Sequence, residues 1–136
     1  MPDKVRTVDY YYITTPDKPG EGARVLAMLK SARVDLLAFH AFPEGGRAQL
    51  DFVPKNTAAF LRAARRAKLK LSEKKKAFLV QGPDRVGATL ATLEKLSAAG
   101  INVTAGSALS AGGRRFGAII WVNPKDFRRA LKALGL

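Results

Sequence analysis

The chain contains no cysteine and a single histidine, His40, among its 136 residues. The absence of cysteine excludes disulfides, thiolate metal sites and cysteine nucleophiles. A Ser-His-Asp triad would depend on His40 alone, and the sequence has neither a Walker pattern nor a Gly-x-Gly-x-x-Gly fingerprint. We therefore predict a protein that is not an enzyme, with no catalytic residues, no metal site and no cofactor.

Long apolar runs are also absent. No stretch of about 20 apolar residues is present, which predicts that no segment spans a membrane. Residues 1–5 lack the apolar core of a secretory signal. Together with the lack of cysteine, these features predict a cytoplasmic protein.

Acidic residues are scarce: 11 Asp and Glu stand against 24 Lys and Arg, a formal net charge of +13. Hydrophobic residues make up 47% of the chain, enough to fill a core. The basic excess makes nucleic acid one partner to consider. The alternative is that these side chains are simply solvated, because they are spread over many parts of the chain.

The chain is an internal repeat. A shift of 67 residues, the spacing between Asp17 and Asp84, aligns the sequence with itself without a gap. It places the phrase Pro-Asp-Lys-Pro-Gly at residues 16–20 on Pro-Asp-Arg-Val-Gly at residues 83–87. The matches include turn, core and surface positions, so we interpret the chain as a duplicated supersecondary unit. Further matched pairs are Leu26/Leu93, Leu29/Leu96, Gly45/Gly112, Arg47/Arg114, Asn56/Asn123 and Phe60/Phe127.

Within each copy the hydrophobic period changes in the same order. Aromatic and β-branched runs at residues 8–13 and 77–80 predict strands, and each phrase is followed by leucines at helical spacing. Two further strands and a Gly-Gly hairpin follow in each copy, and Asn56 or Thr57, and Asn123, are expected to cap the second helices. A last strand is predicted only in the first copy, at residues 69–72.

This order predicts an α+β protein with two ferredoxin-like βαββαβ units in tandem, residues 5–73 and 74–136, each an antiparallel sheet with helices on one face. The second copy ends where its fourth strand should begin, so we expect it to lack that strand. The strand at residues 77–81 would then have an unpaired edge. We predict that a partner chain or an adjacent segment covers this edge.

The motifs resemble those of the ACT domain. In the second copy they are Asp-Arg-Val-Gly at 84–87, Leu93 and Leu96, and Gly-Ile-Asn-Val at 100–103. The first copy has Asp-Lys-Pro-Gly at 17–20. Because the two copies cover nearly the whole chain, the sequence is similar to a free-standing tandem ACT protein.

The resemblance implies a regulatory, allosteric protein that binds an amino acid or a similar small metabolite. ACT domains usually pair side by side, so a homodimer is expected, with ligands at the first strand-to-helix turns and at unit or subunit interfaces. A helix N-terminus suits a carboxylate, and an Asp side chain suits an amino group. The ligand-binding residues so predicted are Asp17, Lys18, Pro19, Gly20, Asp35, Asp84, Arg85, Val86, Gly87 and Asn102.

Five of these residues also have a purely structural interpretation. Asp17 and Asp84 are possible N-caps, and Gly20 and Gly87 possible helix–strand packing positions. Asn102 is able to satisfy backbone groups at a strand start. Its counterpart in the first copy is Asp35, so the two sites are predicted to be unequal.

An RNA-binding protein of the same βαββαβ order is the alternative. Residues 114–121 loosely follow the third-strand pattern of RNA-recognition domains, and Phe78 takes the place of a first-strand stacking ring. Against this, Ala118 stands where a second aromatic residue is needed. A basic cluster is a candidate surface for nucleic acid or an acidic partner. It comprises Arg62, Arg65, Arg66, Lys68, Lys70, Lys74, Lys75 and Lys76.

Overall fold

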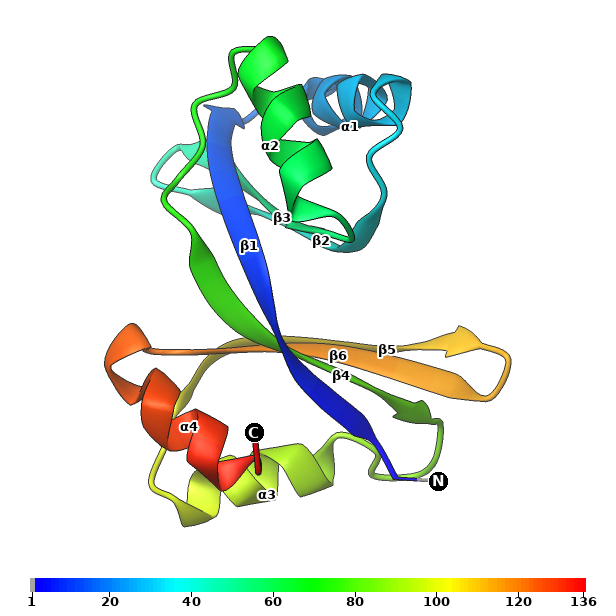
Figure 1. Ribbon diagram of the computed structural model, residues 1–136, viewed down its shortest axis with the longest axis vertical. Helices are drawn as coiled ribbons and strands as arrows, with labels where there is room; N and C mark the ends of the chain where they lie inside the picture. The colour runs from blue at the N-terminus through cyan, green and yellow to red at the C-terminus, as the bar shows by residue number, and fades with distance from the viewer. Residues whose placement is uncertain (1) are drawn as a thin grey trace. The chain divides into compact units, whose positions relative to one another are not determined.

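The computed structural model describes residues 2–136, which form six strands and four α-helices (Figure 1). The predicted order of strands and helices is confirmed in both copies, except for the last strand expected in the first copy. The elements are β1 (Lys4–Pro16), α1 (Glu21–Ser31), β2 (Leu36–Glu44), β3 (Arg47–Pro54), α2 (Thr57–Arg66), β4 (Lys75–Pro83), α3 (Leu90–Ala98), β5 (Val103–Gly112), β6 (Arg115–Val122), the short 3₁₀ helix η1 (Pro124–Asp126) and α4 (Phe127–Ala133).

The chain divides into two compact units. The first unit is Asp9–Lys75, and the second consists of the residues up to Val8 together with Lys76–Leu136. The opening part of β1 therefore belongs to the second unit and the remainder of β1 to the first. The sequence-based boundaries of 5–73 and 74–136 placed residues 5–8 in the first copy, whereas the contacts of these residues lie in the second unit.

The sheet of the second unit has the order β1-β4-β6-β5. The opening residues of β1 lie beside β4, at the edge where the fourth strand of this fold belongs. Val5 packs there against the buried cores of the unit. The prediction that an adjacent segment covers this edge is therefore confirmed, and the N–H and C=O groups of β4 gain a neighbouring strand.

The sheet of the first unit has the order β2-β3-β1, with antiparallel pairs throughout. The prediction of a strand at residues 69–72 is wrong, because this segment is not part of the sheet. The Ser72 N–H donates to the Tyr12 carbonyl at 2.8 Å, and the Tyr12 N–H donates to Ser72 Oγ at 3.0 Å. The serine hydroxyl thus accepts the bond that a backbone carbonyl would accept in a ladder.

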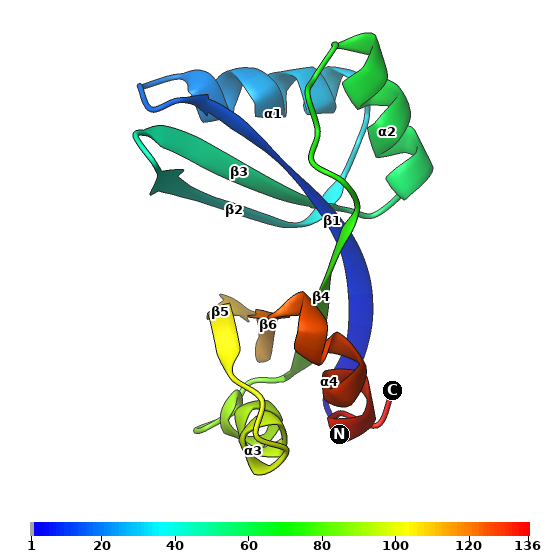
Figure 2. The same cartoon turned by 90° about the vertical axis from the view of Figure 1, so that its left-hand side faces the viewer.

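Both helices of each unit cover one face of its sheet (Figures 1 and 2). The first core includes Leu29 and Phe60, which the helical spacing predicted. Asn56 is confirmed as an N-cap, since its Oδ1 accepts from the Ala59 N–H at 3.0 Å. Asn123 Oδ1 accepts from the Lys125 N–H at 3.1 Å. Asn123 is therefore the N-cap of η1, which directly precedes α4.

All four α-helices end in the same turn. After each helix one residue has positive φ, and the next residue donates its N–H back to a carbonyl five residues earlier at 2.9 Å. The first unit uses Arg33 and Lys68 at the positive-φ position, whereas the second uses Gly100 and Gly135 at the matching positions. Positive φ is unfavourable for any residue that has a Cβ atom. The first copy therefore carries backbone strain at these two positions, which glycine avoids in the second copy.

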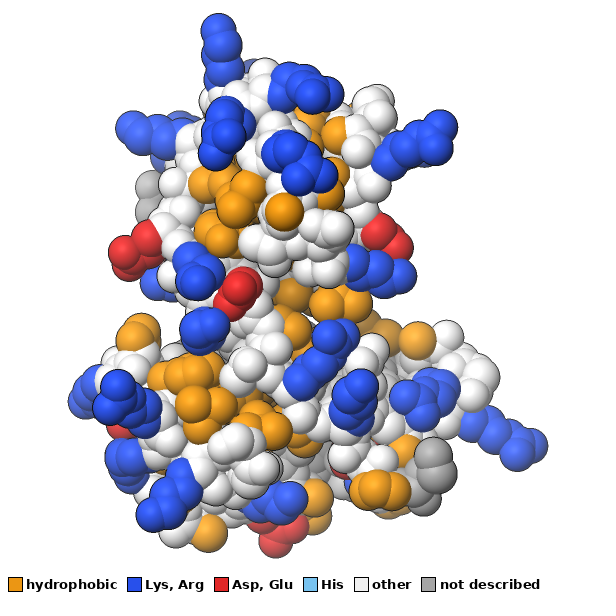
Figure 3. Space-filling view, in the orientation of Figure 1, with side chains coloured by type: hydrophobic (Ala, Val, Ile, Leu, Met, Phe, Trp, Pro, Cys, Tyr) orange, Lys and Arg blue, Asp and Glu red, His pale blue; other side chains and the backbone are white. Residues whose placement is uncertain are grey.

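Lys and Arg side chains are spread over much of the visible surface (Figure 3). Within residues 2–136, no helix is long and apolar enough to cross a membrane.

Candidate functional site: a pocket at the second strand-to-helix turn

The second copy of the repeated phrase forms two tight turns between β4 and α3. The Ala88 N–H donates to the Arg85 carbonyl at 3.1 Å, and the Leu90 N–H donates to the Gly87 carbonyl at 3.0 Å. Gly87 has a φ of 74°, a left-handed conformation that favours glycine. As a result, α3 begins only at Leu90, three residues after the phrase.

A pocket of about 330 Å³ opens beside these turns. The Asp84 carboxylate joins two of its walls, since Oδ2 accepts from Ser110 Oγ at 2.9 Å. The Asp84 N–H also donates to the Arg114 carbonyl at 2.8 Å, so the turn is tied to the β5–β6 hairpin. The lining comes from the turn, from the start of α3, from β5 and from β6: Asp84, Arg85, Gly87, Ala88, Thr89, Leu90, Ala108, Leu109, Ser110 and Phe116.

The rim of the pocket is apolar. Leu90 and Leu109, from α3 and β5, are 58% and 64% exposed. Val86 is fully exposed and does not line the pocket. The pocket therefore combines one carboxylate, one guanidinium and exposed leucine side chains, a combination that suits a small charged molecule with an apolar part.

The Arg85 guanidinium makes a two-pronged ion pair with Asp3. Nη1 and Nη2 donate to Asp3 Oδ1 and Oδ2 at 2.9 Å each, and Nη1 also donates to the Pro83 carbonyl at 2.9 Å. The guanidinium carbon lies 5.7 Å from the centre of the Phe116 ring. The hydrogen bonds from Arg85 lower the pKa of Asp3 below its usual value, and those to Asp3 raise the pKa of Arg85.

The first copy of the phrase is built differently. Gly20 has a φ of 93°, and α1 begins directly after it, with the Arg24 N–H donating to the Gly20 carbonyl at 2.9 Å. Asp17, Lys18 and Pro19 are all exposed. None of these residues lines the pocket beside the second copy, nor a second pocket of residues 26–36 at the end of α1.

The N-cap interpretation of Asp17 and Asp84 is wrong. The residues at the two caps are Gly20 and Thr89, and neither helix has a side-chain cap bond. Each aspartate lies too far before its helix to accept from the free N–H groups of the first turn.

Asp35 and Asn102 lie away from the phrase within their own units. Each precedes the edge strand of its unit, whereas the phrase lies by the hairpin at the other end of that strand. A strand rises about 3.3 Å per residue, so Asn102 is roughly 25 Å from Ser110. Neither unit by itself brings the predicted turn and the predicted strand-start residue together.

Asp35 belongs to the pocket at the end of α1, which has a volume of about 400 Å³. Its Oδ2 pairs with Lys55 Nζ at 2.9 Å, and its Oδ1 accepts from the Leu36 N–H at 2.9 Å. The bond to Lys55, followed by the bond from Leu36, lowers the pKa of this carboxyl. The pocket is lined by Leu26, Leu29, Lys30, Arg33, Val34, Asp35 and Leu36.

Sequence reasoning missed Ser110 and Asp3. Ser110 aligns with Pro43 in the first copy, so comparison of the two copies does not mark Ser110 as a shared residue. Asp3 precedes the repeated region altogether, and only its contact with Arg85 shows its role.

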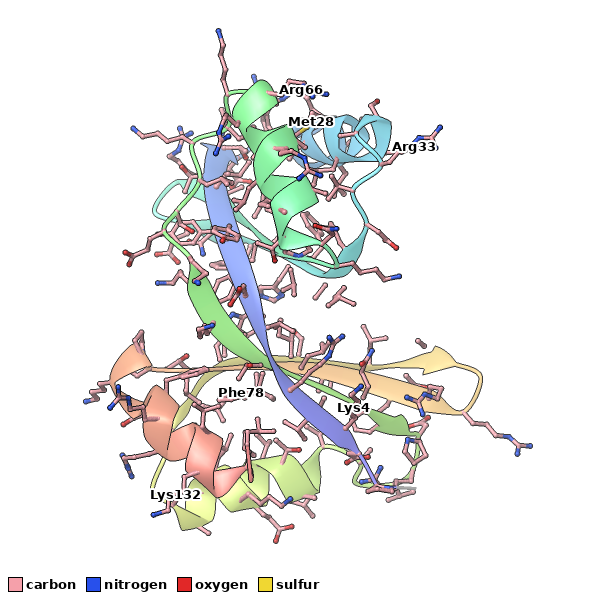
Figure 4. All side chains as sticks on the ribbon, viewed as in Figure 1. Lys4, Met28, Arg33, Arg66, Phe78 and Lys132 are labelled. Carbon is pink, nitrogen blue, oxygen red and sulfur yellow. The ribbon has the colours of Figure 1, made fainter. Side chains whose placement is uncertain are left out.

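The aromatic residues that suggested RNA recognition are not on the surface. Phe78 is completely buried between the sheet of the second unit and its helices, where it stacks on Phe127 with ring centres 4.9 Å apart (Figure 4). Phe116 is only 5% exposed. The expectation that Phe78 presents a stacking ring is wrong, because alternation along β4 directs this side chain to the helix-covered face.

No family model and no curated protein sequence matches the chain. Solved structures do match its fold. A protein from Bacteroides thetaiotaomicron has a TM-score of 0.78 at 16% identity, with 96% of this chain and 90% of that one covered. The regulatory subunit of aspartate kinase from Thermus thermophilus, in its ligand-free form, has a TM-score of 0.61 at 18% identity and coverages of 97% and 95%. The corresponding subunit from Thermus flavus scores 0.59 at 19% identity, with coverages of 98% and 94%.

The chain therefore has the α+β fold of these regulatory subunits, with two ferredoxin-like units. This confirms the fold that the repeated motifs predicted. Among residues 2–136, no group of three or more His, Cys, Asp and Glu side chains is placed to hold a metal ion.

Proposed function

We propose that this chain is a cytoplasmic regulatory protein, not an enzyme, that binds an amino acid or a similar small metabolite in the pocket of the second unit. The observation that carries the proposal is the presence of Asp84 and Arg85 in one pocket lining. A carboxylate and a guanidinium side by side match the ammonium and carboxylate of a zwitterion. The fold shared with regulatory subunits of aspartate kinase supports the same class of function.

In this proposal Asp84 receives the ligand's ammonium group, and the turn at Gly87 lets the ligand approach the backbone. Leu90 and Leu109 contact an apolar side chain. The pocket of the second unit is the main site. The first-copy residues Asp17, Lys18, Pro19, Gly20 and Asp35, and also Asn102 and Val86, stay predicted ligand residues outside its lining.

The test is calorimetry with the standard amino acids, one at a time, on three proteins. Gly87→Leu is expected to abolish binding, and Gly45→Leu to leave it unchanged. The two variants are matched, because both glycines have positive φ and a Cβ atom added to either would have no neighbour within 4 Å. Each should lose about 1–2 kcal/mol of stability from backbone strain alone. Equal binding by the wild type and Gly87→Leu would contradict the proposed site.

We further propose a homodimer formed through β5, by which ligand binding in one subunit is communicated to the other. β5 is an edge strand, and its residues 104–112 are all exposed and include neither charge nor proline. Edges of this kind pair readily with another strand, and two identical edges can pair antiparallel about a twofold axis. Ser107→Lys should give a monomer in sedimentation, whereas Ser97→Lys, the same change on exposed α3, should not. Identical sedimentation of both variants would contradict this dimer.

A second candidate function is binding of a nucleic-acid backbone by the first unit. Arg62, Arg65, Arg66 and Lys68 are exposed, and within residues 2–136 none of them forms an ion pair. Arg66 lies at the end of α2 (Figure 4). In the second unit the counterpart of Arg62, Arg129, pairs with Asp126 at 3.0 Å. At this position the first copy keeps a free cation where the second copy pairs it with a carboxylate, which favours a polyanionic partner for the first unit.

Binding of a labelled single-stranded RNA across a salt series tests this second function. Replacing Arg62, Arg65 and Arg66 by Gln should weaken binding and lower the slope of log affinity against log salt by about 0.7 for each phosphate that is no longer neutralised. The matched control replaces the exposed Lys125, Arg128 and Lys132 of the second unit. Equal losses in both triple variants would assign the binding to net charge alone.

A further inference from the structure

Arg85 lines the pocket of the second unit, yet its guanidinium is directed at Asp3. Both Asp3 oxygens accept from it at 2.9 Å, which is the fork geometry in which arginine binds any carboxylate. We propose that Asp3 occupies the anion subsite of this pocket, and that the carboxylate of a bound ligand replaces it on Arg85. This inference rests on the proposed function and adds a regulatory step to it.

The position of the Asp3 carboxylate is specific. Gly82 lies directly beneath it, and a Cβ atom at this residue would collide with Asp3 Oδ1. The same Cβ would lie 3.1 Å from the Phe116 ring. The side chain of Asp3 is only 12% exposed. The missing side chain at Gly82 thus leaves a space that the carboxylate fills.

The exchange has a structural consequence. The segment before Val8 is held in the second unit by the pairing of β1 with β4, by Val5 in the core and by the Asp3–Arg85 pair. A ligand whose carboxylate binds Arg85 breaks the Asp3–Arg85 pair. The start of β1 is then held less tightly against the edge of β4. Ligand binding and strand docking therefore oppose each other.

Such coupling is reciprocal, so weakening the Asp3 bond must strengthen ligand binding by the same factor. Asp3→Asn should tighten binding of an amino acid by about tenfold, within the usual range of coupling between sites. Arg85→Gln should weaken it. Asp126→Asn is the matched control, because it removes an ion-paired carboxylate of the same unit outside the pocket lining and should not change affinity.

Calorimetry with the standard amino acids on these four proteins, and hydrogen exchange of amides 4–8, test the exchange. We expect faster exchange of these amides in the wild type with ligand, and in Asp3→Asn without it. If an amino acid binds the wild type but Asp3→Asn binds it no tighter, the exchange is overturned and the proposed function stands.

If no amino acid binds any of the four proteins, the proposed function fails. Sodium acetate then tests separately whether Arg85 forms an anion subsite. Acetate, compared with chloride at equal ionic strength, should raise the melting temperature of Asp3→Ala by refilling the space on Arg85. It should not do so for the double variant Asp3→Ala/Arg85→Gln. The same response in both variants overturns the subsite.

Discussion

Arg33 occupies, after α1, the left-handed position that Gly100 occupies after α3, with φ values of 58° and 72°. The two turns are otherwise alike, since Val34 and Ile101 each donate to a carbonyl five residues earlier at 2.9 Å. The same left-handed backbone conformation is therefore occupied by arginine in one copy and by glycine in the other. Exchanging the two residues measures the free energy that a side chain costs in this conformation.

Arg33→Gly is expected to raise the free energy of unfolding by about 1 kcal/mol, because glycine relieves the left-handed strain. The converse change, Gly100→Arg, should lower it by a similar amount. The space around Gly100 is not limiting, as its nearest neighbour would be 3.6 Å from a Cβ atom. Urea unfolding of each variant measures the difference. A destabilised Arg33→Gly protein would show that the arginine makes a compensating interaction.

Gly82→Ala should detach the start of β1 more than it disturbs the remainder of the second unit. The added methyl group and the Asp3 carboxylate cannot occupy the same space. We expect faster hydrogen exchange of amides 4–8 and loss of the Asp3–Arg85 pair. Gly117→Ala is the control, because its Cβ would make only an ordinary contact of 3.8 Å with the Val80 carbonyl. Unchanged exchange in Gly82→Ala would contradict the crowding at this position.

Asp3 should contribute stability that depends on pH. Its pKa is lowered in the folded state, chiefly by the hydrogen bonds from Arg85. The folded protein therefore binds this proton more weakly than the unfolded chain does. The contribution is present above the ordinary Asp value of 3.8 and is lost as pH falls through the lower, folded-state pKa. Melting curves of the wild type and Asp3→Asn should differ at neutral pH and converge in acid.

Asp51 should show the opposite dependence. It is 5% exposed, and burial raises its pKa in spite of the bond that its Oδ1 accepts from Gln49 Nε2 at 2.9 Å. Ionisation of this group at neutral pH therefore opposes folding. Asp51→Asn, whose amide oxygen can still accept from Gln49, should melt higher than the wild type at neutral pH. The gain should shrink as pH falls from the raised pKa towards 3.8. A lower melting temperature for this variant at pH 7 would contradict the assignment.

Much of the fold could be predicted from local patterns. Val25 and Leu29 lie one helical turn apart and are both buried, and Asn56 caps α2 as its position before the helix indicated. Such features depend on neighbours within a few residues, so periodicity and capping rules are sufficient to find them. The contacts of the aspartates in the two phrases could not be predicted in this way. Asp84 bonds Ser110 from a different strand, and no local pattern marks that partner.

By itself, the sequence determined the duplication, the order of the elements apart from the strand expected at residues 69–72, and many of the core residues, although Leu90 and Leu93 are exposed. Tertiary structure alone decided that the start of β1 joins the second unit and that Arg85 binds Asp3 across a separation of 82 residues. It also decided that Asp35 and Asn102 lie far from the turns of their own units. The physical reason is that a strand edge carries the same N–H and C=O groups whatever its sequence. Its partner is chosen by which distant edge is left open, and here that edge is the one along β4.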